Sequence, residues 1–171
     1  MTFIQNLAKK SVRNSPAYSS ARSLVRDARI FLDANENSLG SVLGKIENTE
    51  LSRYPDPLAE SLRKKLAVYA KVRANQILVG NGSDEIIWLL LLAFVESNEE
   101  VLTVAPTFSM YRVFANLLGL KVREIQLEKN HSLDTEKIRA AISKKTKLIF
   151  LCSPNNPTGQ AISLADIEKI L

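Results

Sequence analysis

The residues Ser153-Pro154-Asn155-Asn156-Pro157-Thr158-Gly159 follow directly on the largely apolar run Lys147–Cys152. A short apolar run bounded by turn residues is typical of a buried strand. Prolines, asparagines and a glycine then form a dense turn, because each of these residue types favours turn conformations. An asparagine amide at a strand end can donate a hydrogen bond to a phenolate-type oxygen, although a tight turn alone would also account for this motif. The stretch predicts a strand with a specialised loop at its carboxyl end.

Upstream of this loop, the apolar periodicity alternates between the strand and helix patterns. Strands are predicted at Ile30–Ala34, Gln76–Val79, Glu100–Ala105 and Lys121–Leu127. Helices are predicted after Asp56-Pro57, from Asp84 to Glu96, from Phe108 to Leu118 and from Asp134 to Ile142, with a last helix after Ser163. Repeated strand–helix–strand units predict an α/β fold, a mostly parallel sheet with flanking helices.

Several of these helices have recognisable end signals. Asp56-Pro57 supplies an N-cap and a proline at the first helical position, and Ser83 is expected to cap the Asp84 helix. Gly119 is expected to end the helix before it, while Ser163 and Asp166 form a capping box. The Asp84 helix is apolar on nearly every face, so we expect it to be buried.

Composition excludes several classes of function. With 46% apolar and 24% charged residues, the chain of 171 residues is expected to be soluble and globular. Its longest apolar run, Ile86–Val95, is about half of the roughly 20 residues needed to span a bilayer. The net charge of +5 is spread along the chain, which favours an anionic small molecule over nucleic acid. A single cysteine, Cys152, and a single histidine, His131, predict neither a disulfide nor a metal site.

The first 26 residues contain basic side chains and no acidic ones. This composition faintly resembles a mitochondrial presequence, but a basic amino-terminal arm of a cytoplasmic protein is the preferred interpretation.

Ligands of parallel sheets collect beyond the carboxyl ends of the strands, where three loops stand out: Gly80–Ser83, Ala105–Phe108 and Ser153–Gly159. The first loop has two glycines before a helix start, which suits an anion. Because Glu85 takes the third glycine position of a dinucleotide fingerprint, a single phosphate fits better than a pyrophosphate. An ordinary strand-to-helix turn remains the alternative. In the second loop, Phe108 could stack on a flat ring or simply begin a helix in the core.

Five motifs in order along the chain carry a resemblance to a known family. They are Asp33–Asn37, Arg53–Pro57, Asn81–Glu85, Pro106–Phe108 and Ser153–Gly159. Together they resemble fold-type I aminotransferases, in the branch of histidinol-phosphate aminotransferase. The resemblance implies a pyridoxal-phosphate-dependent enzyme of histidine biosynthesis, which moves an amino group from histidinol phosphate, the donor, to the 2-oxo acid 2-oxoglutarate. Related aromatic amino acid aminotransferases, threonine-phosphate decarboxylase-like enzymes and a non-catalytic fragment remain alternatives.

The resemblance also assigns residues to the pyridoxal 5'-phosphate cofactor. It implies that Gly82, Ser83 and Asp84 lie at the cofactor phosphate, that Phe108 stacks on the pyridine ring, and that Asn156 hydrogen-bonds the phenolic oxygen. Phe108 stands where relatives more often have tyrosine.

Two further sets of residues are implied beyond the cofactor ring. Tyr54 resembles a tyrosine that reaches the phosphate of the neighbouring subunit, which implies a homodimer. Asn35 and Tyr18 resemble positions near the substrate. Ser38 replaces a usual proline, and Ala17 separates Pro16 from Tyr18 where relatives have Pro-Tyr. Both departures affect the substrate side.

The family's catalytic lysine, which forms a Schiff base with the cofactor, lies tens of residues after the NPTG motif. Lys144 precedes that motif and is not expected to take this role, so no catalytic residue is assigned. The resemblance thus implies the amino-terminal part of a large domain, incomplete and inactive alone, or paired with a separately encoded second half. Residues 1–52 are expected to form an arm and the start of a substrate-side segment, and residues 53–171 a partial cofactor-binding domain.

Overall fold

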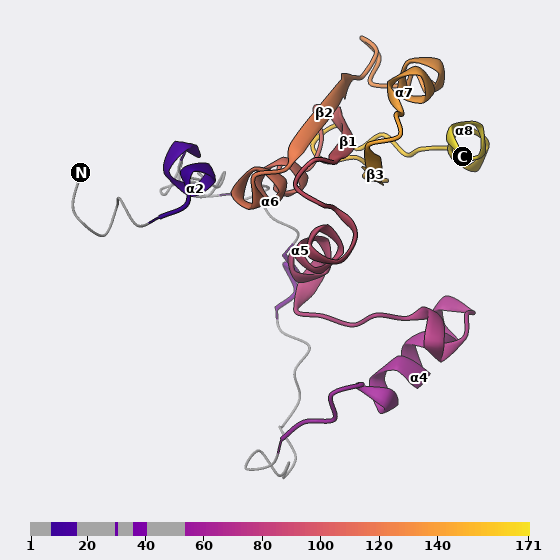
Figure 1. The fold of residues 1–171 in the computed structure, drawn as a ribbon. Helices are drawn as coiled ribbons and strands as arrows, with labels where there is room; N and C mark the ends of the chain where they lie inside the picture. The colour runs from indigo at the N-terminus through magenta and orange to yellow at the C-terminus, as the bar shows by residue number, and fades with distance from the viewer. Residues whose placement is uncertain (1–7, 17–29, 31–35, 41–53) are drawn as a thin grey trace. The chain divides into compact units, whose positions relative to one another are not determined.

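The computed structural model describes residues 8–16, 30, 36–40 and 54–171 (Figure 1). The chain divides into two compact units, Met1–Pro16 with Gly80–Leu171, and Ala17–Val79. The predicted strand Ile30–Ala34 lies almost wholly outside the described residues. The expected boundary between residues 52 and 53 also falls outside them, so that division into domains stays a prediction.

A three-stranded parallel sheet organises the first unit. Its strands are β1 (Glu100–Ala105), β2 (Lys121–Gln126) and β3 (Thr146–Phe150), in the order β2-β1-β3. β1 has the predicted bounds, and the ends of the other two lie within two residues of prediction. Both pairings of β1 are parallel, with Glu100 aligned to Lys121 on one side and Thr146 on the other. The predicted α/β architecture is therefore confirmed.

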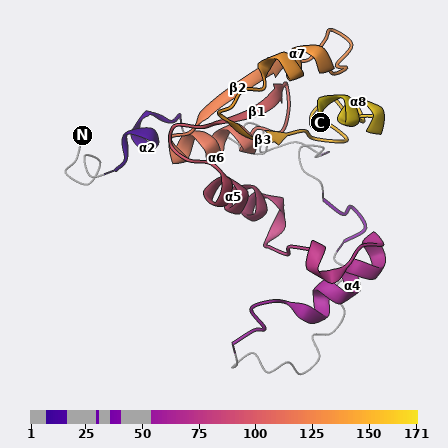
Figure 2. The same ribbon diagram turned by 45° about the vertical axis from the view of Figure 1, so that its right-hand side comes forward.

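Helices cover both faces of this sheet (Figures 1 and 2). On one face, α5 (Gly82–Phe94) and α6 (Met110–Leu118) enclose a cluster of buried residues: Ile87, Leu91, Val101 and Ala115. On the other, α7 (Thr135–Ala141) and α8 (Leu164–Ile170) enclose Leu102, Val104, Ile138 and Ile170. Because successive strand side chains point to opposite faces, the central strand contributes to both clusters.

Helix α5 is less buried than its sequence predicts. Ile87 and Leu91 lie in the core, but Leu89, Leu92 and Phe94 are 41%, 55% and 60% exposed. A helix lying on a sheet buries only the stripe that faces the sheet. The expectation of burial on every face is therefore wrong for the described structure.

The start of α5 also differs from expectation. Its N-cap is Asn81, and Ser83 lies inside the first turn rather than capping it. The helix begins at Gly82, two residues before the predicted Asp84, and Gly82 has φ +79°, a left-handed conformation that glycine adopts without strain. The backbone N–H of Asn81 donates to the Glu85 carboxylate, which therefore folds back over the first turn.

Most other predicted helix ends are confirmed. Gly119 ends α6 in the left-handed region at φ +77°. Asp134 caps α7 by accepting from the N–H of Lys137 at 2.9 Å. The Ser163 hydroxyl accepts from the Asp166 N–H at 3.0 Å and caps α8.

A short helix near the amino terminus, α2 (Lys10–Asn14), was not predicted. It rests against α6, where the Ser11 hydroxyl donates to the Leu117 carbonyl at 2.9 Å. Since the last carbonyls of a helix have no partner within the helix, Ser11 satisfies one of them.

The second unit contains α4 (Glu60–Ala70) and the 3₁₀ helix η1 (Ala74–Gln76). The helix predicted after Asp56-Pro57 begins only at Glu60, because the Asp56 carboxylate forms a turn by accepting from the N–H groups of Leu58 and Glu60. These N–H groups lower the pKa of Asp56.

The predicted strand Gln76–Val79 is not formed among the described residues. Gln76 belongs to η1, and Ile77 is extended at φ −116° without a sheet partner. An extended segment becomes a strand only when another strand pairs with it. No helix of the part of the chain that the structure describes is long and apolar enough to cross a bilayer.

Candidate functional site

The candidate site lies where β1 and β3 end, because neighbouring parallel strands present their carboxyl ends at one edge of a sheet. β1 leads into the loop that carries Phe108, and β3 leads into the loop that carries Asn156. Both are residues that the family resemblance assigns to a cofactor ring. The structure thus brings the second and third predicted loops to the same edge.

Asn155 joins these two loops. Its side-chain Nδ2 donates to the Pro106 carbonyl at 3.0 Å, and its Oδ1 accepts from the Thr107 hydroxyl at 2.7 Å. The same amide donates to the Thr158 hydroxyl at 2.9 Å. Asn155 is only 6% exposed, whereas its neighbour Asn156 is exposed and free to meet a ligand.

Backbone bonds close the loop after β3 around Asn155. Its N–H donates to the Gln160 carbonyl at 2.8 Å, and its carbonyl accepts from the Gly159 N–H at 2.7 Å. Gly159 adopts φ +72°, which allows the chain to reverse here. The loop is therefore a closed turn with Asn155 inside and Asn156 on its surface.

Phe108 belongs to a row of aromatic rings. It meets Tyr111 edge-on with ring centroids 5.5 Å apart, and Tyr111 stacks on Phe150 at 4.7 Å. Burial, followed by the influence of the Cys152 thiol, raises the pKa of Tyr111 to about 12. Tyr111 is thus a neutral, partly buried support for the Phe108 ring. Phe108 also packs on the core cluster that contains Ile87.

This packing relates Phe108 to the predicted phosphate loop. Ile87 follows Ser83 by one helical turn on the same side of α5, so the first turn of α5 adjoins the cluster that supports Phe108. Gly82 and Ser83 are exposed, and a Cβ at Gly82 would meet nothing within 4 Å. The Gly82 N–H already donates to the Gly80 carbonyl at 3.0 Å, whereas the N–H groups of Ser83 and Asp84 have no hydrogen-bond partner among the described residues. Open space and such free N–H groups at a helix start suit a phosphate.

Acidic side chains partly oppose an anion at this helix start. Asp84 and Glu85 lie in the first turn, where their negative charges stabilise the helix through its dipole but repel a phosphate. The Glu85 carboxylate is occupied by the Asn81 N–H. Phosphate binding would therefore depend on the N–H groups of Ser83 and Asp84 and on the open space at Gly82, rather than on side-chain charge.

Three assigned residues belong to the other compact unit or lie outside the described residues. Tyr54 belongs to the other compact unit, and its side chain is fully exposed. Asn35 and Tyr18 lie outside the described residues. Lys144 lies in the turn that precedes β3, at the amino ends of the strands and hence at the opposite edge of the sheet.

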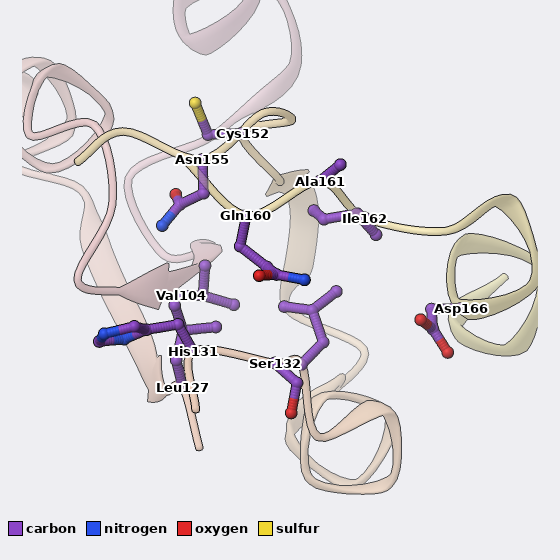
Figure 3. Close-up of a pocket in the computed structure, with 11 residues that line it drawn as sticks. Val104, Leu127, His131, Ser132, Cys152, Asn155, Gln160, Ala161, Ile162 and Asp166 are labelled. Carbon is purple, nitrogen blue, oxygen red and sulfur yellow. The ribbon is translucent and has the colours of Figure 1, made fainter. Parts of the chain in front are cut away.

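Two cavities flank the loops. One of about 190 Å³ is lined by Thr107 and Phe108, and by Arg112, which pairs with Glu124 at 3.4 Å. A second cavity of about 60 Å³ lies on the α7 and α8 side, and the side chains of Asn155 and Gln160 point downward into it in Figure 3. Cys152 points the other way in this view. The second cavity has room for little more than water.

The chain belongs to the aminotransferase class I and II family, whose model matches residues 28–171. Members of this family generally depend on pyridoxal phosphate and act on amino and 2-oxo acids. The fold neighbours agree with the parallel sheet and flanking helices described above.

Among curated relatives, the chain is 42% identical to histidinol-phosphate aminotransferase of Parabacteroides distasonis over 173 aligned residues, which cover 100% of this chain and 48% of the relative. It is 41% identical to the enzyme of the same name from Bacteroides thetaiotaomicron, again over 100% of this chain and 48% of that one. The chain thus spans about half the length of the curated relatives it matches.

Solved structures give a similar answer. The histidinol-phosphate aminotransferase of Clostridium acetobutylicum matches 71% of this chain and 35% of its own, with 29% identity and a TM-score of 0.60. The aspartate aminotransferase of Rhizobium meliloti matches 66% of this chain and 29% of its own, with 26% identity and a TM-score of 0.57. Both structural likenesses identify the fold rather than the amino donor.

The described residues suit the cofactor of this family. An open helix start, an aromatic ring and an exposed amide are the groups that a phosphate, a flat ring and a phenolic oxygen require. The sequence did not single out Asn155 or Tyr111. The doubled asparagine was a signal for the former, and the Phe-x-x-Tyr spacing at the start of α6 for the latter.

Proposed function

We propose that this chain forms the cofactor-docking part of a cytoplasmic, pyridoxal-phosphate-dependent aminotransferase that acts on L-histidinol phosphate and 2-oxoglutarate. One observation carries the proposal: Phe108 and Asn156 stand on the loops after neighbouring parallel strands, at one edge of the sheet. The curated relatives favour histidinol phosphate as the donor.

In this proposal each residue has a limited task. Phe108 covers one face of the cofactor ring, and Asn156 donates to its phenolic oxygen. Gly82, Ser83 and Asp84 lie at its phosphate, which the N–H groups of Ser83 and Asp84 bind. The bound cofactor supplies an electron-withdrawing ring that stabilises charge on the substrate carbon. None of these residues forms or breaks a covalent bond.

Further parts of the proposal concern residues beyond this edge. Tyr54 would reach the phosphate of a neighbouring subunit, which requires a homodimer. Asn35 and Tyr18 would lie near the substrate. Residues 1–52 would form the substrate-side arm and residues 53–171 the partial cofactor-binding domain.

The first test is binding of pyridoxal phosphate to the chain, measured by calorimetry. We expect Phe108→Ala and Asn156→Ala each to weaken binding about fivefold, because an aromatic or hydrogen-bonded contact of this kind contributes about 1 kcal/mol. Phe94→Ala is the matched control, since Phe94 is an exposed phenylalanine at the end of α5. Equal binding by all four proteins would contradict the assigned docking site.

The second test concerns the reaction. A chimera would carry this chain in place of the matching half of the Parabacteroides distasonis enzyme. We expect it to form glutamate from histidinol phosphate and 2-oxoglutarate, and to lose activity with Phe108→Ala. A folded, cofactor-loaded chimera that used aromatic amino acids instead would refute the proposed substrate.

A further inference from the structure

We propose that Asn155 is a positioning residue, which holds the loop after β1 and the loop after β3 in one fixed relation. Phe108 and Asn156 then approach the same cofactor ring as a unit. This inference rests on the proposed function, but the coupling of the two loops can be measured without any cofactor.

The hydrogen bonds of Asn155 cross between segments distant in sequence. Pro106 and Thr107, which contact its amide at 3.0 and 2.7 Å, lie 49 and 48 residues before it. The bond to Thr158 at 2.9 Å stays within its own loop. One side chain therefore connects the two loops directly, close to the residues that would meet the ring.

The chemistry of the partners fixes the orientation of this amide. The Pro106 carbonyl can only accept a hydrogen bond, so the amide nitrogen must face it and the amide oxygen must face the Thr107 hydroxyl. Both amide hydrogens are used, one on Pro106 and one on Thr158. Because the side chain is nearly fully buried, an unpaired group here would not regain a bond from water.

The fixed Asn155 amide determines the positions of residues in both loops. Phe108 follows Thr107 directly, and its ring is in edge-on contact with Tyr111 at a centroid distance of 5.5 Å. Asn156 follows Asn155 directly and is exposed at the loop surface. A shift of the Asn155 amide would therefore move the stacking ring and the phenolic-oxygen donor relative to each other.

Isosteric substitutions separate this role from simple packing. Asn155→Asp keeps the size but places an oxygen against the Pro106 carbonyl, where the two acceptors repel. Thr107→Val removes only the hydroxyl donor, and Thr107→Ser restores it. Asn130→Asp is the matched control, because exposed Asn130 uses only its acceptor oxygen, on the Ser132 N–H and hydroxyl, and aspartate keeps that acceptor.

The first readout is amide hydrogen exchange of the chain without ligand, followed in segments 106–111 and 153–160. We expect Asn155→Asp and Thr107→Val to raise exchange at least about fivefold in both segments together. Thr107→Ser and Asn130→Asp should match the unmodified chain. A rise confined to the mutated loop would overturn the proposal.

The second readout compares pyridoxal phosphate with inorganic phosphate as ligands of the chain. If Asn155 is a positioning residue, Asn155→Asp should weaken the binding of pyridoxal phosphate about tenfold or more. The affinity for inorganic phosphate should change less than about twofold, because the helix start of α5 is unaffected. Equal weakening of both ligands would indicate general destabilisation and overturn the proposal. Thr107→Val gives a milder test should Asn155→Asp fail to fold.

The two proposals can fail separately. If the unmodified chain binds phosphate but not pyridoxal phosphate, the proposed function is wrong, and so is the role of Asn155 toward that ring. Coordinated exchange in both loops would still support the structural coupling. If pyridoxal phosphate binds and Asn155→Asp leaves its affinity unchanged, only the positioning role is wrong.

Discussion

Two adjacent leucines on α5 provide a direct test of how this helix lies on the sheet. Leu91 is 0% exposed and belongs to the core cluster with Val101, whereas Leu92 is 55% exposed. Replacing each by alanine makes the same chemical change in the same helix turn. The difference in unfolding free energy between the two variants therefore reports burial alone.

The expected magnitudes follow from these exposures. Leu91→Ala removes buried carbon atoms worth roughly 0.8 kcal/mol each and leaves a cavity, which gives a loss of about 3–5 kcal/mol. Leu92→Ala removes a side chain that is less than half buried, so about 1 kcal/mol is the upper bound. The slightly higher helix propensity of alanine offsets a few tenths of that. We expect a gap of at least about 2 kcal/mol between the variants.

Urea unfolding followed by Trp88 fluorescence measures this gap. Trp88 reports on α5 itself, because it lies in that helix with its ring edge-on to Phe114 at 5.6 Å. With a slope of about 1–3 kcal/mol per molar urea, Leu91→Ala should lower the midpoint by about 1 M or more at unchanged slope. Midpoints of the two variants within about 0.2 M of each other would refute the placement of α5.

Two further predictions concern the opposite edge of the sheet and the end of α6. Hydrogen bonds from the Ser143 hydroxyl first, and then from Thr146, lower the pKa of buried Glu100 below its ordinary 4.5. The folded state therefore gains stability from this carboxylate above about pH 4.5 and loses that stability as the pH falls through the lowered pKa. In thermal melts, Glu100→Gln should be less stable than the unmodified chain at neutral pH, and its melting temperature should change less as the pH is lowered. Gly119→Ala should lower the unfolding free energy in urea by about 1–2 kcal/mol, because the residue has φ +77°. The new Cβ would lie 3.7 Å from Ser11, an ordinary contact, so the loss would come from the backbone conformation and not from a clash. An unchanged midpoint would contradict the left-handed conformation.

The sheet could be predicted from the sequence because its strands are short apolar runs bounded by strong turn signals. Pro106 and the Ser153–Gly159 segment mark the carboxyl ends of β1 and β3 within a few residues. The capping residues Gly119, Asp134 and Ser163 act locally, so their roles could be recognised without knowledge of the fold.

The failures at α5 and at Gln76–Val79 depend on information from elsewhere in the molecule, whereas the late start of α4 has a local cause. The composition of α5 indicates burial on every face, but only tertiary packing decides which faces meet a partner. Gln76–Val79 has strand-like residues and no strand beside it in the described chain. At Asp56 the local turn competes with the helix and delays its start to Glu60.

The candidate site was only half predictable for the same reason. The motif of residues 155–159 predicts a role for an asparagine, but it does not show which of Asn155 and Asn156 turns inward. That choice depends on Pro106 and Thr107, which come from a different part of the chain. Residues that act through long-range hydrogen bonds leave little trace in local sequence pattern.

The central strand keeps two polar networks apart. Glu100, which accepts a hydrogen bond from Thr146, is the first residue of β1, and the bond from Asn155 to the Pro106 carbonyl lies just beyond the last residue of this strand. At about 3.3 Å per residue, about 20 Å of strand separates these two sets of hydrogen bonds. Free-energy changes at sites farther apart than about 10 Å add nearly independently. An evolving lineage can therefore change the stability of the fold at one edge of the sheet and the proposed cofactor contacts at the other, without epistasis between the two.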